Sequence, residues 1–166
     1  MIFYGLNVLS PSIFLVATLI ITSVVSLATG SSWTTAATIG IALMGVGQGL
    51  GIEPPIIAGA IISGAYFGDK MSPLSDTTNL APAVSGATLF DHIRHMVYTT
   101  GVSYLITLVI FAFIGMQYSG QQLDFAQIEA INSAINGSFN INLFLLLPPV
   151  LVIVMVALKV PALPGL

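Results

Sequence analysis

GAYFGDKMSPLSDTTNLAP, from Gly64 to Pro82, places two aspartates, Asp69 and Asp76, in a chain that carries few other charges. The chain is 56% hydrophobic and 5% charged, whereas about a quarter of the residues in soluble domains are charged. Because the apolar runs are long and unbroken, the composition predicts an all-α, polytopic transmembrane protein rather than a β-barrel. A carboxylate inside a bilayer costs about 2.5–3.5 kcal/mol on insertion scales, so this stretch is a candidate functional site.

Several apolar segments around this stretch are expected to cross the membrane, which would make residues 1–166 one partial transmembrane domain. The expected spans are residues 11–28, 36–51, 55–90 with a break at 69–82, 97–116 and 139–158. Ile56–Gly68, about thirteen residues long, is too short to cross alone at about 1.5 Å per residue. A short apolar piece that ends in a polar, proline-containing break is typical of a discontinuous transporter helix. Glu53-Pro54-Pro55 is expected to form the turn before it.

The residues of the break are those that a hard cation would need. Pro73 and Pro82 would free the carbonyls of Asp69 and Thr78 if helix surrounded them. Sodium, like other hard cations, prefers carboxylate, carbonyl, hydroxyl and amide oxygens as ligands. The candidate ion- and proton-binding residues are Asp69, Ser72, Ser75, Asp76, Thr77, Thr78 and Asn79. Among these, the Na⁺ ligands are expected to be Asp69, Asp76, Thr77 and Asn79.

Exchange of a proton for a cation follows if a carboxylate can hold either one but not both. Burial raises the pKa of a carboxylate, and a second carboxylate nearby raises the pKa of one of the pair further. Which aspartate carries the proton stays open, because coupled groups titrate as a pair. Lys70 is expected either to pair permanently with an aspartate or to take part in transport. Asp76 could instead cap the following helix, and the hydroxyls could satisfy the backbone of a broken helix.

A second polar stretch precedes the apolar segment that starts near residue 36. Its hydroxyl residues, Ser31, Ser32, Thr34 and Thr35, either face the first break or form a local turn. Further along, Gly45 and Gly49, and likewise Gly47 and Gly51, stand at GxxxG spacing. This spacing predicts close packing between helices.

The remaining charges indicate orientation rather than chemistry. Asp91–His95 is expected to be a solvated turn at the membrane interface, in preference to a metal or proton-relay cluster. By the positive-inside rule, Arg94 and Lys159 are expected on the cytoplasmic side, which puts Asp91–His95 and the end of the span 139–158 there. Residues 117–140 are then expected outside. No basic patch with interleaved aromatic residues is present, so nucleic acid is not an expected partner. The absence of cysteine excludes disulfides, thiolate metal sites and cysteine nucleophiles.

Two segments, GSSWTTAATIGIALMGVG (Gly30–Gly47) and ISGAYFGDKMSPLSDTTNLAP (Ile62–Pro82), resemble the NhaC-type Na⁺/H⁺ antiporters. That family, which includes Na⁺-coupled malate/lactate exchangers, belongs to the ion-transporter superfamily. The resemblance implies a multi-pass protein of the prokaryotic inner membrane, an inverted-repeat fold and secondary active exchange of Na⁺ for H⁺. It also implies that the seven candidate residues bind the ion, with residues 30–35 as a second loop. Because family members are considerably longer, the chain is expected to be an internal to C-terminal fragment that needs the remainder of the transporter.

Other functions remain as alternatives. A Na⁺-coupled organic-anion antiporter would need a cationic site for the substrate carboxylate, and only Lys70 offers a charge there. An intramembrane aspartyl protease is disfavoured because Tyr66-Phe67-Gly68-Asp69 lacks the first glycine of GxGD. An inactive fragment or scaffold is the third alternative. The expected partners are therefore Na⁺, H⁺ and the lipid bilayer, with no cofactor and no enzyme activity, and the oligomeric state is left open.

Overall fold

A computed structural model describes residues 10–119 together with residues 147 and 151, and its regular structure there is entirely helical. The elements are α2 (Pro11–Thr29), α3 (Ser32–Thr35), the π-helical η1 (Ala36–Gly40), α4 (Ile41–Gly49), α5 (Pro54–Met71), α6 (Asp76–Ser85) and α7 (Leu89–Gln117). The predicted all-α class is confirmed for this part of the chain. The expected span 139–158, apart from residues 147 and 151, and most of the connection before it lie outside the described residues.

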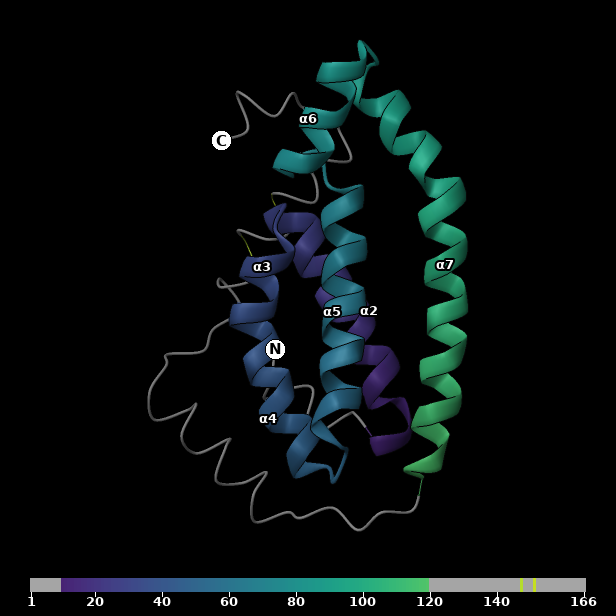
Figure 1. The fold of residues 1–166 in the computed structure, drawn as a ribbon. Coiled ribbons are helices and arrows are strands. Elements are labelled where there is room, and N and C mark those ends of the chain that lie inside the picture. Colours follow the sequence, from purple (N-terminus) through teal and green to yellow (C-terminus); the bar gives the residue numbers. More distant parts are fainter. Residues whose placement is uncertain (1–9, 120–146, 148–150, 152–166) are drawn as a thin grey trace.

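Three helical segments pack side by side and a fourth lies along them (Figure 1). α2 and α5 run in the same direction, whereas α3, η1 and α4 form one continuous run in the opposite direction. α6 follows the end of α5, and α7 returns along the flank of α2 and α5. Of the described helices, α2 and α7 are long and apolar enough, by length and composition, to cross a membrane.

Two glycines on α5 bring its backbone against α2. A Cβ atom on Gly64 would overlap the carbonyl oxygen of Leu19, and one on Gly68 would overlap that of Ser23. Gly64 and Gly68 stand at GxxxG spacing, which lets helix backbones approach closely in a membrane. The Ser26 hydroxyl also donates across this contact to the carbonyl of Ala65. The α2–α5 pair is therefore the closely packed centre of the described fold.

Of the two glycine pairs that the sequence singled out, Gly45, Gly47 and Gly49 lie on α4 and Gly51 follows it. Gly47 does pack tightly, because an added Cβ would lie 2.5 Å from the Ile57 side chain and 2.8 Å from that of Phe14. Gly45 and Gly49, in contrast, have no described atom within 4 Å of an added Cβ. Gly49 is nevertheless buried, and close packing by this pair stays a prediction.

α7 begins at Leu89, so it contains the predicted span 97–116 and extends before it. The Thr88 side chain caps the helix by accepting the Asp91 N–H at 3.3 Å, and Asp91 lies in the first turn. A capping hydroxyl and an acidic first turn both stabilise a helix start. Asp91–His95 is therefore helical rather than the predicted turn, and the helix continues beyond its apolar part.

Three contacts along α7 hold it against α2 and α5. Gly115 lies against the carbonyl of Ser12 near one end. In the middle of the helix, the Tyr104 hydroxyl is 2.8 Å from the Ser23 hydroxyl. The Tyr104 ring also stacks on Phe67, with ring centroids 3.8 Å apart and planes inclined by 15°. Through these contacts Tyr104, near the middle of α7, packs beside the last turns of α5.

Both predicted breaks are shorter in the structure. The first comprises only Gly30 and Ser31, because Gly30 ends α2 in the left-handed region (φ 69°) and Ser31 caps α3. Helix therefore starts at Ser32 instead of residue 36. The second break comprises residues 72–75 rather than 69–82, and Pro82 lies inside α6. Pro54 begins α5 instead of forming the predicted turn with Glu53, as prolines are tolerated in a first turn.

Candidate functional site

The site is built around the four residues that join α5 to α6. The Ser72 N–H donates to the Asp69 carbonyl at 3.1 Å, which closes the end of α5. The Asn79 amide nitrogen donates to the carbonyls of Pro73 and Ser75, each at 2.7 Å. The Thr78 hydroxyl reaches back to the Asp69 carbonyl at 3.2 Å and to the next carbonyl at 3.3 Å. Side chains of α6 thus satisfy carbonyls that the break leaves free.

The two polar breaks lie against each other. A Cβ on Gly30 would be 2.7 Å from the carbonyl carbon of Leu74, so only glycine fits there. The Ser72 hydroxyl donates to the carbonyl of Leu27 in the last turn of α2 at 2.8 Å. The ends of α2 and α5 therefore meet at the same place as the beginnings of α3 and α6 (Figure 1).

Asp69 is the buried carboxylate of this site. Its side chain, in the last turn of α5, is 8% exposed. One oxygen, Oδ2, accepts a hydrogen bond from the Ser32 hydroxyl at 2.9 Å. The other, Oδ1, is buried and has no hydrogen-bond partner among the described residues. A buried polar atom without a partner is costly, so Oδ1 is a place for a cation or a proton.

Asp76 is in a different environment, because it is exposed in the first turn of α6. Its Oδ1 accepts the N–H of Thr77 at 2.7 Å. Ser75 caps α6 by accepting the N–H of Thr78 at 3.5 Å, so Asp76 is not the cap that the sequence allowed. The two aspartates, equivalent in the sequence pattern, thus differ in burial.

Lys70 turns toward α6 rather than toward a carboxylate. Its Nζ donates to the Thr77 hydroxyl at 3.2 Å and lies 5.3 Å from the centre of the Tyr66 ring. The Thr77 hydroxyl is in turn 3.1 Å from that of Ser75. In the described part of the chain Lys70 forms no ion pair with Asp69 or Asp76.

The predicted residues therefore separate into groups with different partners. Asp69 is joined to Ser32 at the start of α3, whereas Lys70, Thr77 and Ser75 form a chain of polar contacts between the end of α5 and the start of α6. The hydroxyls of Ser72, Ser75 and Thr78 are buried and bond to backbone groups. At the start of α3, the Ser31 side chain accepts from the N–H and the hydroxyl of Thr34, and the Thr35 hydroxyl donates to the Ser31 carbonyl. Only Ser32 of that set contacts Asp69.

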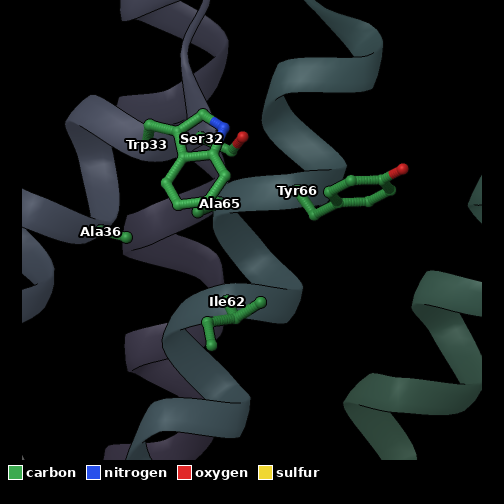
Figure 2. Close-up of a pocket in the computed structure, with 6 residues that line it drawn as sticks. All are labelled: Ser32, Trp33, Ala36, Ile62, Ala65 and Tyr66. Carbon is green, nitrogen blue, oxygen red and sulfur yellow. The ribbon is translucent and has the colours of Figure 1, made fainter.

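A cavity of about 290 Å³ between α5 and the run that begins at Ser32 was not anticipated from the sequence. It is lined by Ser32, Trp33, Ala36, Ile62, Ala65 and Tyr66 (Figure 2). Ile62, Ala65 and Tyr66 precede Asp69 by seven, four and three residues, which is the spacing of one helix face. That spacing was readable in the sequence, but the opposite wall depends on tertiary packing.

Replacing Thr78 with valine tests the link between α5 and α6. The change keeps the shape and removes the donor to one buried and one partly buried carbonyl, so a loss of about 1–3 kcal/mol is expected. Thr107→Val is the control, since Thr107 is exposed and bonds only within its own helix. Thermal unfolding of the complete protein in detergent measures both. Equal midpoints for the two variants would show that the link does not stabilise the junction.

Comparison with known proteins identifies the chain's relatives. Residues 64–166 match the Na⁺/H⁺ antiporter family. The chain is 49% identical over 164 residues to the malate-2H⁺/Na⁺-lactate antiporter of Bacillus subtilis. It is 48% identical over 166 residues to the Na⁺/H⁺ antiporter NhaC of Alkalihalophilus pseudofirmus, and 42% identical over 166 residues to the arginine/ornithine antiporter ArcD of Halobacterium salinarum. No solved structure matches the chain.

These alignments cover 99%, 100% and 99% of this chain but 35%, 36% and 34% of the respective relatives. The chain thus spans about a third of the length of the curated relatives it matches. The described residues are helical, two of their helices are long and apolar enough to cross a membrane, and antiporters match the chain over nearly its whole length. The chain belongs to the Na⁺/H⁺ antiporter family. The predicted resemblance to NhaC-type antiporters is confirmed.

Proposed function

We propose that the complete protein, of which this chain forms part, is a secondary active transporter that exchanges Na⁺ for H⁺. The observation that carries this proposal is the buried Asp69 carboxylate, whose Oδ1 has no partner in the described residues while Ser32 holds Oδ2. A proton on Asp69 or a sodium ion beside it would satisfy that oxygen, and each excludes the other. Family membership and the name of the NhaC relatives support Na⁺ and H⁺ as the two exchanged ions.

The position of Asp69 along α7 supports a site within the membrane. Phe67 stacks on Tyr104, which lies close to the middle of α7. Asp69 follows Phe67 by two residues of helix, or about 3 Å at 1.5 Å per residue. If α7 crosses a hydrocarbon core of about 30 Å, Asp69 lies well inside it. This is the depth at which discontinuous transporter helices bind their ions.

The charge that favours a cation at this site is the Asp69 carboxylate itself. The ends of α2 and α5 and the beginnings of α3 and α6 meet there, so partial charges of both signs are present. We keep Asp69, Asp76, Thr77 and Asn79 as the sodium ligand set, with the buried Asp69 innermost and the exposed Asp76 and Thr77 at the mouth. Ser32 joins this set as the residue that orients Asp69.

The finer architecture is part of the proposal. α5 and α6 form one discontinuous membrane helix, and the second half of an inverted repeat lies in the remainder of the transporter. The protein resides in the prokaryotic inner membrane, surrounded by lipid. It acts as a transporter rather than an enzyme and needs no cofactor.

A Na⁺-coupled organic-anion antiporter is the second candidate, and Lys70 favours it. The Lys70 ammonium bonds only to a hydroxyl and an aromatic face in the described residues. It is therefore free to hold a substrate carboxylate. The malate-2H⁺/Na⁺-lactate antiporter among the relatives supports the same idea.

Reconstitution of the complete reading frame distinguishes the two candidates. Proteoliposomes with an acid interior receive NaCl outside while the internal pH is followed. For Na⁺/H⁺ exchange, sodium alone raises the internal pH, whereas choline chloride and protein-free liposomes give no response. A response that requires malate or lactate together with sodium would replace the proposal with the organic-anion antiporter. No response to either would contradict both.

A further inference from the structure

Lys70 places a positive charge on a member of the proposed sodium ligand set. It follows Asp69 directly in the last turn of α5, and its Nζ donates to the Thr77 hydroxyl in the first turn of α6 at 3.2 Å. The same ammonium lies 5.3 Å from the centre of the Tyr66 ring, within the range of a cation–π contact. Tyr66 precedes Lys70 by four residues, so the two side chains share a face of α5. The ring and the hydroxyl together hold the ammonium across the break.

The Thr77 hydroxyl oxygen is the atom that a bound sodium ion and Lys70 would share. This oxygen accepts from Lys70 and lies 3.1 Å from the Ser75 hydroxyl. A hydroxyl oxygen has two lone pairs, so an ammonium on one of them leaves at most one for a metal cation. Two positive charges on one oxygen repel each other, and Thr77 is exposed, so water weakens this repulsion without removing it. Sodium and the ammonium therefore compete for Thr77.

The contacts of Lys70 allow its ammonium to leave this position. In the described residues they are a hydroxyl and an aromatic ring, and neither of them is an ion pair with Asp69 or Asp76. Lysine carries its ammonium on a flexible four-carbon stem. The side chain can therefore release Thr77 without a change in the backbone of α5 or α6.

We propose that the Lys70 ammonium is a tethered competitor of Na⁺ at the mouth of the site, which sodium displaces from Thr77 in order to bind. This inference rests on the proposed function and deepens it, because it names a residue that sets the sodium affinity without being a ligand. The Asp69 carboxylate attracts the ion, and the charge of Lys70 opposes it. The charge at residue 70 thus sets the sodium concentration at which the site fills.

Lys70→Met tests this competition, because it keeps an apolar stem and removes the charge. The measurement is equilibrium binding of ²²Na⁺ to the purified complete protein in detergent. The dissociation constant is expected to fall by about fivefold or more, since a repelling charge is removed from a partly exposed site. Lys70→Gln is a second variant without the charge and should change the constant in the same direction. A merely structural role of Lys70 would weaken binding or leave it unchanged.

Two controls separate the charge at residue 70 from charge in general. Lys70→Arg keeps the charge, so its dissociation constant is expected within about twofold of the native value. Arg94→Gln removes a positive charge from an exposed position on α7, outside the proposed ligand set, and should also stay within about twofold. Tighter binding in Arg94→Gln equal to that in Lys70→Met would overturn the proposal, because net charge alone would then explain the effect.

Thr77→Val tests whether the competition occurs at the shared oxygen, since valine keeps the shape and lacks the hydroxyl. The Lys70→Met change is measured in the native protein and again in Thr77→Val, as a double-mutant cycle. In the Thr77→Val background it is expected to lower the dissociation constant by about twofold or less, because neighbouring residues that share one contact are not additive. An effect of equal size in both backgrounds would overturn the proposal.

The results distinguish this inference from the proposed function. Native binding that is lost in Asp69→Asn, but is unchanged or weakened in Lys70→Met, would support the Asp69 site and overturn the role of Lys70. Binding that is detected in Lys70→Met but not in the native protein would support the competition. If neither protein binds ²²Na⁺, the sodium site and the inference are both overturned. Unfolding midpoints close to the native value show that each variant retains the fold.

Discussion

Asp69→Asn is expected to reduce sodium-dependent proton exchange by at least about 100-fold, because an amide of the same shape carries neither the charge nor the proton. The buried carboxylate is the one described group whose unpartnered oxygen fits either ion. Internal pH in proteoliposomes of the complete protein, after addition of NaCl, measures the effect. Equal extraction and unfolding midpoints for native and variant protein would show that the fold is retained.

Asp91→Asn is the matched control, because Asp91 is exposed at the start of α7, far along the chain from the break. Its exchange rate is expected to stay within about twofold of the native rate, as surface charges contribute little. Asp76→Asn should fall between the two, since Asp76 is exposed in the present structure. Exchange that survives in Asp69→Asn but not in Asp76→Asn would move the ion site to α6.

Gly64→Leu is expected to prevent stable packing of α2 against α5. An added Cβ already overlaps the Leu19 carbonyl oxygen and the Thr22 hydroxyl, and a backbone atom cannot move aside as a side chain can. Overpacking usually costs about 1–3 kcal/mol, and this contact is with backbone, so the upper end or more is expected. Yield and unfolding midpoint of the complete protein in detergent report the loss.

Gly45→Leu is the control for Gly64→Leu, because Gly45 is also helical but has no described atom within 4 Å of an added Cβ. Replacing an open helical glycine removes a helix-destabilising residue, so the midpoint should be unchanged or slightly raised. If both leucine variants unfold at the native temperature, the glycines of α5 do not determine the packing.

The interruption near Asp69 was predictable because prolines, hydroxyls and carboxylates are concentrated in one stretch. Its length was not, because residues 72–75 are the whole break only when Ser75 caps α6 and Asn79 satisfies the carbonyls of Pro73 and Ser75. These contacts depend on how the chain folds back on itself. The positions of the prolines alone therefore overestimated the length of the break, and Pro82 lies within α6.

Partners of Asp69 were harder to predict than Asp69 itself. Ser32 lies 37 residues away in the sequence, and its neighbours Ser31, Thr34 and Thr35 offered the same chemistry. Only the start of helix at Ser32 places one hydroxyl of that set toward α5. Likewise, Asp69 is buried and Asp76 exposed because α5 and α6 turn different faces toward the rest of the fold on either side of residues 72–75. Composition and spacing do not reveal that difference.

The π-helical segment between Ser32 and α4 has a mechanical consequence. A π turn contains about one residue more than an α turn, so Ala36–Gly40 stores surplus chain within an otherwise continuous helix. Rewinding it to α geometry would rotate the first turn by about 100° relative to α4, the angle of one residue. That rotation would withdraw the Ser32 hydroxyl from Asp69 while Ile41–Gly49 stayed in place. A change between π and α geometry in η1 would therefore make or break the hydrogen bond that Ser32 donates to Asp69 on α5.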